Sequence, residues 1–582
     1  MNTIPRNEHP RPDRMREEWL NLNGKWDFEI DNAKVGAFKK FEERRSLDST
    51  IVVPFCPESR LSGIANTDFM NAVWYRRDIE VPKEWNGKRV ILHIDACDHD
   101  TTVFVNAKKV GTHKGGYTSF SFDITDFLNE SDNYITVYAE DDTRSGKQPS
   151  GKQSRRLESR GCYYTRTTGI WQTVWLEAVE PAHIVLYKAY PNITDTSVTL
   201  ETVTSEAAIG GELTVIASYE GKEMGRAVSK VSSLSTTVKL SLAEEHLWEV
   251  GKGRLYDLKF ELTKDGKTDI LNGYFGLREV VLTKKKGLMI NGKTVFGRFV
   301  LDQGFYPEGI ITAPDDKSLI FDIEASMACG FNGARLHQKV FEPRFLYHAD
   351  THGYMVWGET ANWGFDHTEY ANLEYFLPSW IEEIDRDFSH PSIIGWCPFN
   401  ETWDQHGCQQ CNALIDSAYL VAKAMDKTRP VIANSGSYPT NYTDAHDVHD
   451  YEQDPEKFRS NYSEIENGIV RDVLYRLDPK RQKAKTWLPI FVSEYGGIRW
   501  LKKDDSNAWG YGESVTTEDD FFKRLEGLTD ALLENEHIFA YCYTQLTDVE
   551  QEQNGVLTYE REFKFPPERF AAIFGKKSVI ED

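Results

Sequence analysis

The chain has 582 residues, of which 91 are acidic and 68 are basic, so its formal net charge is −23. This balance argues against nucleic acid as a partner, because phosphate binding needs clustered Lys and Arg. No stretch approaches the roughly 20 apolar residues that span a bilayer, and residues 1–18 lack the apolar core of a secretory signal. We therefore expect a cytoplasmic protein with reduced thiols, no nucleic-acid partner and no membrane contact.

Residues 1–180 have the pattern of β-structure. Short alternating or apolar runs lie at 74–79, 89–94, 102–105 and 134–138, and the block closes with an apolar run at 169–177. Strands at such spacing, separated by turn residues, are typical of a sandwich or jelly roll. We predict an N-terminal β jelly-roll sandwich over these residues, a fold that also serves lectins.

Residues 181–278 differ in composition, because aromatic residues become rarer and Thr, Ser, Val and Lys more frequent. The runs 197–201 and 213–217 alternate with period two. A β-domain of about 100 residues has the size of an immunoglobulin-like sandwich. We predict such a sandwich here, acting as a spacer and stabiliser.

Residues 279–582 alternate short apolar runs with longer amphipathic stretches, which is typical of βα units. Eight candidate strands lie at 295–301, 332–336, 354–358, 393–398, 431–433, 447–449, 490–493 and 539–544. One intervening stretch, 316–330, is a predicted helix with Asp315 as its N-cap. Eight strands in about 300 residues predict a C-terminal catalytic (β/α)8 TIM barrel. The long gap between 449 and 490 is a candidate loop over the site.

Polar or charged residues follow each apolar run of the predicted barrel. In such barrels the reacting groups lie at the carboxyl ends of the strands, so these residues should meet at one rim. A structural barrel has no need of this pattern, and we interpret it as a site. The candidates from the strand ends are Asp302, Arg335, His337, Glu359, Asn400, Glu401, His449, Tyr451 and Glu494.

Two carboxylates at one rim suit glycosidic bond cleavage, in which one donates a proton while the other attacks or activates water. Three predicted strands end in glutamate, namely Glu359, Glu401 and Glu494. Spacing alone does not settle which two react. Asn400, directly before Glu401, is the best internal clue, because an amide there can hold the 2-hydroxyl of a sugar.

The chain resembles glycoside hydrolase family 2, the family of β-galactosidases, β-glucuronidases and β-mannosidases. The resemblance covers nearly the whole length and rests on motifs that occur in the family's order. They lie at 19–26, 57–59, 115–125, 169–171, 330–335, 390–392, 400–401, 493–496, 545–548 and 554–555. It implies a retaining double displacement with Glu401 as general acid/base and Glu494 as nucleophile. It also implies that Asn400 contacts the 2-hydroxyl and that Tyr451 hydrogen-bonds the nucleophile.

Further candidates for sugar contact come from the same resemblance or from the residue type. Tyr543 lies where many family members have a Trp floor, and Trp363 is the better candidate for an exposed stacking ring than Trp357. Arg335, His337 and His449 either contact the sugar or orient carboxylates. We expect no cofactor and no metal, since Cys408 and Cys411 have CxxC spacing but no second ligand pair nearby. A homo-oligomer, dimer or tetramer, is compatible with the family.

The glycone is the least determined feature. Family β-glucuronidases carry an Asn-x-Lys element after the eighth strand, whereas residues 548–555 here contain three acids and no Lys. This favours a neutral terminal sugar, with β-galactose first and α-L-arabinopyranose second. Arg499, near Glu494, keeps a glucuronide or galacturonide open. A catalytically inactive carbohydrate-binding protein is the alternative of another class, and a transglycosidase would use the same residues.

Overall fold

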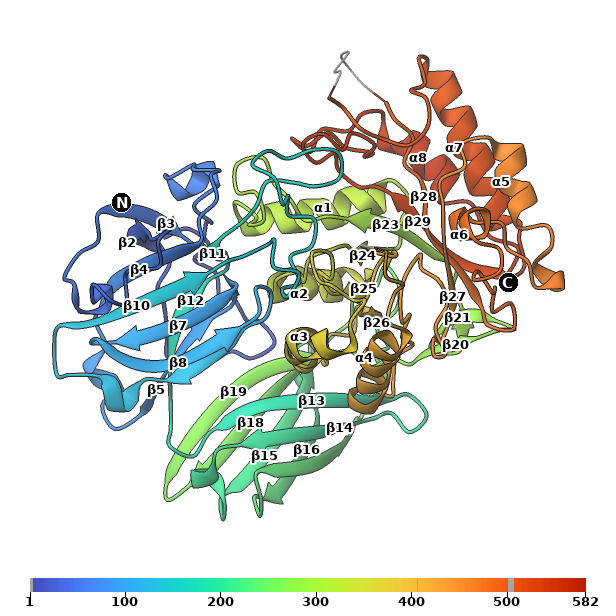
Figure 1. The fold of residues 1–582 in the computed structure, drawn as a ribbon. Coiled ribbons are helices and arrows are strands. Elements are labelled where there is room, and N and C mark those ends of the chain that lie inside the picture. The colour runs from blue at the N-terminus through green and yellow to red at the C-terminus, as the bar shows by residue number, and fades with distance from the viewer. Residues whose placement is uncertain (1–3, 406, 501–506, 582) are drawn as a thin grey trace.

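The computed structural model describes residues 4–405, 407–500 and 507–581. Three blocks follow one another along the chain (Figure 1). A blue sandwich comes first, a green sandwich second, and a barrel in yellow to red forms the third. None of the helices in these described ranges is long and apolar enough to cross a membrane.

The first block is a sandwich of two antiparallel sheets. Inward positions alternate along the strands and form one core with Trp26, Leu92 and Val103, as expected where one face of each strand is buried. This confirms the predicted N-terminal sandwich. One sheet has the order β3 (Ser49–Val53), β2 (Gly24–Ile30), β4 (Ala72–Ile79), β10 (Asn133–Glu140), β7 (Asp100–Val105) and β8 (Lys108–Lys114). The other has β1 (Trp19–Asn21), β12 (Val174–Val179), β5 (Arg89–Ile94) and β9 (Phe120–Asp123), while β6 (Cys97–Asp98) pairs with β11 (Gly169–Ile170).

The second block confirms the predicted immunoglobulin-like sandwich. The strand pattern is clearest in β17, where every second residue is buried. A two-residue turn at Asp265 and Gly266, both with positive φ, joins β18 to β19, as tight hairpins require. Its sheets are β13 (Ile184–Asn192), β14 (Ser197–Thr204) and β17 (Ser235–Ser241), against β16 (Lys222–Lys230), β15 (Glu212–Tyr219), β18 (Tyr256–Lys264) and β19 (Lys267–Phe275).

The third block is a closed-up parallel sheet surrounded by helices. Seven strands have the order β26 (Ile393–Cys397), β25 (Met355–Glu359), β24 (Gly333–Leu336), β23 (Gly297–Asp302), β29 (Ile538–Thr544), β28 (Ile490–Gly496) and β27 (His446–Asp450). A small sheet of β20 (Val280–Thr283), β21 (Gly287–Ile290) and β22 (Lys293–Thr294) precedes them. Leu288 and Ile290 of this sheet belong to the inner core with Phe299, Phe491 and Phe539.

The predicted fifth strand, 431–433, is not a regular strand, which corrects the strand count. The segment still takes the position of the strand missing from the seven-stranded sheet, next to β26. Isolated parallel bridges join Val431 to Trp396 and Ser435 to Asn400. The backbone N–H of Ile432 donates to the carbonyl of Trp396 at 2.9 Å. Pro430 lacks an N–H, and Gly436 turns the chain away with φ 60°, so the ladder is short. The TIM-barrel prediction holds.

Helices cover the outside of the barrel and match the predicted alternation. Asp315 caps α1, since its side chain accepts the N–H of Ser318 at 2.9 Å, as predicted. Between β27 and β28, the long segment carries two short helices, α5 and α6. The helices are α1 (Asp316–Ala328), α2 (Pro343–His352), α3 (Leu373–Asp387), α4 (Asn412–Met425), α5 (Pro455–Asn461), α6 (Val473–Leu477), α7 (Glu518–Leu533) and α8 (Pro567–Phe574).

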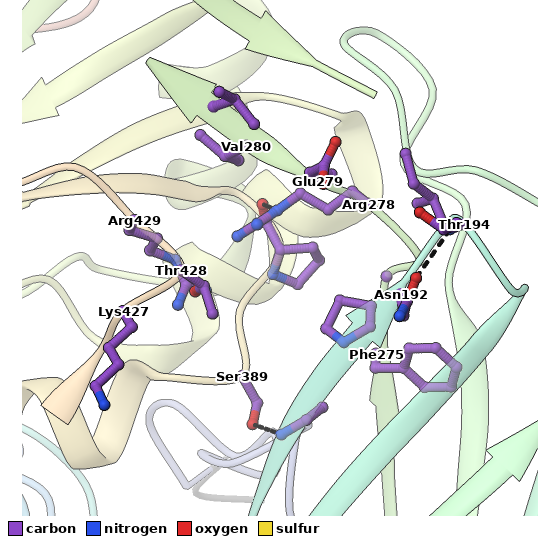
Figure 2. A pocket seen from close by; sticks show the side chains of 16 residues that line it. Asn192, Thr194, Phe275, Arg278, Glu279, Val280, Ser389, Lys427, Thr428 and Arg429 are labelled. Atoms are coloured by element: carbon purple, nitrogen blue, oxygen red, sulfur yellow. Dashed lines mark hydrogen bonds between the residues drawn. The ribbon is translucent and has the colours of Figure 1, made fainter. Parts of the chain in front are cut away.

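A cavity of about 430 Å³ lies where the second sandwich meets the barrel (Figure 2). Arg278 spans this joint and donates from Nε and Nη2 to the carbonyl oxygens of Pro391 and Ile393, both at 2.7 Å. Arg429 donates to the same Ile393 carbonyl at 2.7 Å. Because Ile393 begins β26, the joint lies at the amino ends of the strands, where barrels place stabilising contacts.

Candidate active site

Strand alternation brings most of the predicted residues to the interior of the carboxyl-end rim. Trp357 of β25 and Phe491 of β28 belong to the core inside the barrel. Glu359, two positions after Trp357, therefore points inward again. Glu494 comes three positions after Phe491, beyond a register shift in β28. Register shifts at Val448/His449 and within Val492–Tyr495 re-aim the ends of β27 and β28. The residues that meet there are Arg335, His337, Glu359, Asn400, Glu401, His449, Tyr451 and Glu494.

Arg335 is the centre of this cluster and is 1% exposed. Its Nη2 donates to Glu359 Oε2 at 2.8 Å and to Asn400 Oδ1 at 2.8 Å. Its Nη1 donates to the Ser493 carbonyl at 2.7 Å and to Glu494 Oε1 at 3.2 Å. A planar guanidinium with five N–H groups can hold several acceptors at fixed angles. Arg335 therefore orients Glu494 and Asn400 together.

Glu494 is buried but held in its charged form. Tyr451 donates a hydrogen bond to Oε2, while Arg335 bonds to Oε1. Burial acts to raise the pKa of Glu494, but the positive charges of His449 and Arg335 and the Tyr451 hydrogen bond lower it to about 2. A buried, ionised carboxylate held at both oxygens is suited to nucleophilic attack.

Glu401 lies at the mouth of the cluster and is partly exposed. Its Oε1 is 2.9 Å from His449 Nδ1, which lies 3.4 Å from Glu494 Oε2. An oxygen of Glu401 and one of Glu494 lie within 4.8 Å of each other, the short separation found in retaining rather than inverting glycosidases. The backbone of Glu401 is left-handed, with φ 48°, a conformation that is uncommon for residues other than glycine.

His449 is the link between the two carboxylates. Burial acts to lower its pKa, but the charges of Glu494 and Glu401 raise it. Nε2 of His449 is 2.9 Å from the Ser435 hydroxyl, which fixes the ring. Ser435 comes from the segment in the place of the fifth strand, so that segment supports the site.

Glu359 and His337 support the cluster from behind. Nδ1 of His337 is 2.7 Å from Glu359 Oε1, and the other oxygen of Glu359 accepts two bonds from Arg335. Burial raises the pKa of Glu359 against the opposing charge of Arg335. Both oxygens of Glu359 are thus taken up by Arg335 and His337.

Three predicted site residues lie outside the cluster: Trp363, which lines a neighbouring cavity, and Tyr543 and Asp302, which face away. Tyr543 is fully buried and packs against Tyr495 and Phe574 of α8, so its ring faces the helices. Asp302 comes directly after a residue of the inner core, and its Oδ1 accepts the N–H of Gly304 at 2.9 Å. Burial and the nearby Asp322 raise the pKa of Asp302 to about 7. Both positions follow from strand alternation, which turns them away from the barrel axis.

Trp363 lines a second cavity of about 430 Å³ that contains Glu401. Part of the same wall comes from the first domain, whose Tyr163 ring packs against the Trp363 ring with 5.3 Å between centroids. In Figure 1 the teal part of the chain runs from the blue sandwich to the barrel. The backbone of Ser150 bonds to the Trp363 carbonyl at 2.8 Å. Residues of two domains therefore line the site. The sequence alone does not indicate this.

Lys152 is a further residue from the first domain. It is buried, its Nζ lies 3.2 Å from Glu552 Oε2, and it lies 5.7 Å from the centroid of the Trp363 ring. Glu494 and Glu552 both act to raise the pKa of Lys152 against the effect of burial. Glu552 belongs to the acidic stretch after β29, so one acid of that stretch is already neutralised.

The other two acids of this stretch are also held. Asp548 Oδ1 lies 2.7 Å from the ammonium of Lys564 and accepts the N–H of Gly555 at 2.8 Å. The Glu550 carboxylate accepts the backbone N–H of Thr165 at 3.1 Å and 3.2 Å. The three acids thus contact the first domain and the barrel. The argument that they would repel a uronate assumed free carboxylates, and the structure gives each of them a partner.

The donor atoms of Glu401, His449 and Glu494 lie close enough together to hold a metal ion. Hydrogen bonds account for the same atoms, because His449 faces Glu401 and Ser435 while Tyr451 and Arg335 occupy Glu494. The two carboxylates and the imidazole therefore form a connected hydrogen-bond network in which protons can be exchanged.

Comparison with known proteins finds a match for each of the three domains. Residues 20–176 match "Glycosyl hydrolases family 2, sugar binding domain", residues 182–278 match "Glycosyl hydrolases family 2", and residues 283–499 match its "TIM barrel domain". A β-galactosidase of Thermoanaerobacter pseudethanolicus is 25% identical over 377 residues, which are 62% of this chain and 48% of that protein. A β-glucuronidase of Sus scrofa is 24% identical over 541 residues, which are 84% of this chain and 79% of that protein.

Solved structures share the fold. A β-glucuronidase from an uncultured Clostridium sp. has a TM-score of 0.77 at 20% identity, with 96% of this chain and 98% of that chain covered. A Ruminococcus gnavus β-glucuronidase has a TM-score of 0.79 at 18% identity, covering 99% of each chain. The chain spans about half the length of the first two curated β-galactosidases, 48% and 42%. Three successive domain matches nevertheless cover most of the chain, which therefore belongs to glycosyl hydrolase family 2.

Proposed function

We propose that the protein is a retaining, exo-acting β-glycoside hydrolase with Glu494 as nucleophile and Glu401 as general acid/base. The observation that carries this proposal is the pairing of a doubly hydrogen-bonded, ionised Glu494 with a partly exposed Glu401 whose carboxylate oxygen lies within 4.8 Å.

In this mechanism the Glu494 carboxylate attacks the anomeric carbon while Glu401 protonates the departing glycosidic oxygen. The bond to the aglycone breaks and a covalent glycosyl-enzyme forms at Glu494. Glu401, now ionised, takes a proton from water, which attacks the same carbon and releases Glu494. Arg335 and Tyr451 hold Glu494 in line, and His449 is available to exchange a proton with Glu401 at 2.9 Å.

Asn400 is placed to bind the sugar next to the reacting carbon. Its Oδ1 accepts from Arg335 at 2.8 Å, which directs the amide nitrogen away from the guanidinium. That Nδ2 atom is buried and has no hydrogen-bond partner within the described part of the chain. A buried unpaired donor is rare in a folded protein, and a hydroxyl of the glycone is the partner we propose for it.

For the glycone, we keep β-galactose as first choice and α-L-arabinopyranose as second. A β-glucuronide or β-galacturonide is the further candidate favoured by a specific observation. The cation Lys152 stands at the site, and the three acids after β29 each have a partner. Relatives named β-galactosidase and β-glucuronidase both match this chain at similar identity, so their names do not separate these sugars.

The test is a panel of nitrophenyl glycosides covering β-galactoside, β-glucoside, β-glucuronide, β-galacturonide, β-mannoside, β-fucoside and α-L-arabinopyranoside. The wild type and Glu494→Ala are assayed side by side. We expect the galactoside to be turned over fastest and Glu494→Ala to lose activity. A galactoside rate far below the others would overturn that glycone. Equal inactivity of both proteins on all substrates would leave the carbohydrate-binding alternative.

A further inference from the structure

The cavity beside Glu401 is lined by two arginines, although the protein as a whole carries a net charge of −23. Arg155 and Arg160, both exposed, lie on its wall. Neither has a carboxylate within 4.0 Å among the described side chains, although the chain holds 91 acidic residues. Arg155 donates from Nη2 to the carbonyl of Gly364 at 2.6 Å, which anchors it against the barrel. Glu401 lines the same cavity but faces His449, so neither arginine is paired with an acid of this wall in the described structure, and both are available to a ligand.

The position of this cavity relative to Glu401 indicates which part of a substrate it receives. A general acid must reach the glycosidic oxygen, so the leaving sugar lies on the Glu401 side of the cleaved bond. Glu494, Asn400 and Arg335 form the opposite, buried side. The cavity, at about 430 Å³, falls within the usual range for small-ligand sites. It is therefore placed for the aglycone.

The remaining lining suits a sugar ring. Trp363 and Tyr163 lie 5.3 Å apart between centroids with a 37° angle between their planes. Trp403 also lines the cavity. Aromatic faces suit the apolar faces of pyranose rings, and Arg guanidinium groups bind carboxylate or sulfate through paired N–H donors. The acid nearest in sequence, Glu158, forms no ion pair with either arginine in the described structure.

We propose that this cavity is the aglycone subsite and that it takes a sugar unit bearing an anionic group, either a carboxylate or a sulfate, bound by Arg155 and Arg160. The inference rests on the proposed function and adds the class of the leaving group. The natural substrate is then an acidic oligosaccharide whose terminal sugar is removed from an anionic neighbour.

The experiment compares kcat/KM for matched disaccharides. The best glycone of the nitrophenyl panel is joined to glucose, to glucuronate or to glucose 6-sulfate. Wild type, Arg155→Gln, Arg160→Gln and the double variant are measured, with Arg156→Gln as the matched control, because Arg156 is an exposed arginine of the same loop outside the cavity lining. The readout is the ratio of kcat/KM for each anionic disaccharide to that for the neutral one.

We expect a ratio above about 10 for the wild type and for Arg156→Gln, a fall in each single variant, and a ratio near 1 in the double variant. The ratio should also fall with added salt, because exposed charges are screened. The arm with the larger ratio identifies carboxylate or sulfate. A wild-type ratio near 1, or a ratio that survives in the double variant, would overturn the proposal.

Failure of the proposed function is distinguishable from failure of this inference. Turnover of nitrophenyl glycosides without a preference for anionic aglycones rejects only the subsite. If no glycoside is turned over, calorimetric titration with free glucuronate and glucose 6-sulfate against glucose still tests the cavity. Tighter binding of either anion in the wild type than in the double variant supports the subsite, and equal binding rejects it.

Discussion

Lys152 of the first domain and Glu552 of the barrel form a buried ion pair, with Nζ 3.2 Å from Oε2 and exposed side-chain fractions of 5% and 1%. Tyr164, also from the first domain, donates a hydrogen bond to the same Glu552 oxygen. The pair joins two domains at the edge of the catalytic cluster. The first domain therefore forms part of the wall of the proposed active site, and its position should affect both stability and catalysis.

Replacing Lys152 by Met should destabilise the protein by about 3–5 kcal/mol, because it leaves the Glu552 charge buried without its ion-pair partner. Thermal denaturation measures the change. Lys34→Met is the matched control, since Lys34 pairs with Glu140 where the side chains are 42% and 38% exposed. It should cost at most about 1 kcal/mol. The double variant Lys152→Met/Glu552→Gln should recover part of the loss, and equal midpoints for Lys152→Met and Lys34→Met would contradict this account.

Removing the charge of His449 should move the acid limb of the pH profile. The pKa of Glu494 is about 2, so in the wild type this proposed nucleophile is ionised at any pH above about 4. His449→Gln takes away a positive charge that lowers this pKa, so it rises and Glu494 becomes protonated at higher pH. We expect the acid limb of kcat/KM for a nitrophenyl glycoside to shift upward by about one pH unit or more.

His446→Gln is the control for this shift. His446 is buried at the amino end of the same strand, and it is not among the groups that lower the pKa of Glu494. It should leave the acid limb in place. An unchanged limb in His449→Gln would show that His449 does not set the ionisation of Glu494.

The roles of Glu401 and Glu359 should separate by leaving group. Glu401→Gln should lose on the order of 10²–10⁴-fold in kcat/KM on a disaccharide, because its poor leaving group needs a proton. The loss on a nitrophenyl glycoside should be much smaller. Glu359→Gln should lose similar factors on both substrates, because Glu359 acts through Arg335 at 2.8 Å. Equal losses for Glu401→Gln on both substrates would contradict its acid role.

The barrel rim is predictable from sequence because each of its residues follows an apolar run that can be found locally. Glu401, Glu494 and His449 each follow such a run, and all three meet at the rim. The orientation of a side chain is harder, because barrel strands are apolar on both faces and their alternation is hidden. Tyr543 is the clearest case, since it comes after Cys542 of the inner core and therefore faces α8.

Contacts between domains leave no local pattern at all. Lys152 lies in a loop far along the chain from Glu552, and nothing in its neighbours indicates a buried cation. Gly151, next to Lys152, likewise approaches the carbonyl oxygen of Gln338 in the barrel only in the folded chain. A long-range pair of this kind depends on how the first sandwich docks on the barrel. The sequence alone therefore predicts the barrel's share of the site and misses the share of the first domain.

Gly151→Ala tests this docking directly. Gly151 has φ 60°, and a Cβ placed there would lie 2.2 Å from the carbonyl oxygen of Gln338. The loop would have to move away from the barrel and carry Lys152 with it. Gly63→Ala is the matched control, because Gly63 has φ 79° but a Cβ added to it would have no neighbouring atom within 4 Å. Left-handed backbone costs both variants about 1–2 kcal/mol, so the difference between them isolates the clash.

We expect Gly63→Ala to retain wild-type kcat/KM on a nitrophenyl glycoside and Gly151→Ala to lose at least about tenfold, since misplacing a binding group by about 1 Å can cost on the order of 100-fold. The comparison is made well below both melting temperatures, so that differences in folded fraction do not enter. Equal activity of the two variants would mean that the loop carrying Lys152 can shift without disturbing Glu401 and Glu494. In that case the first domain would only support the barrel, and the catalytic geometry would belong to the strand ends alone.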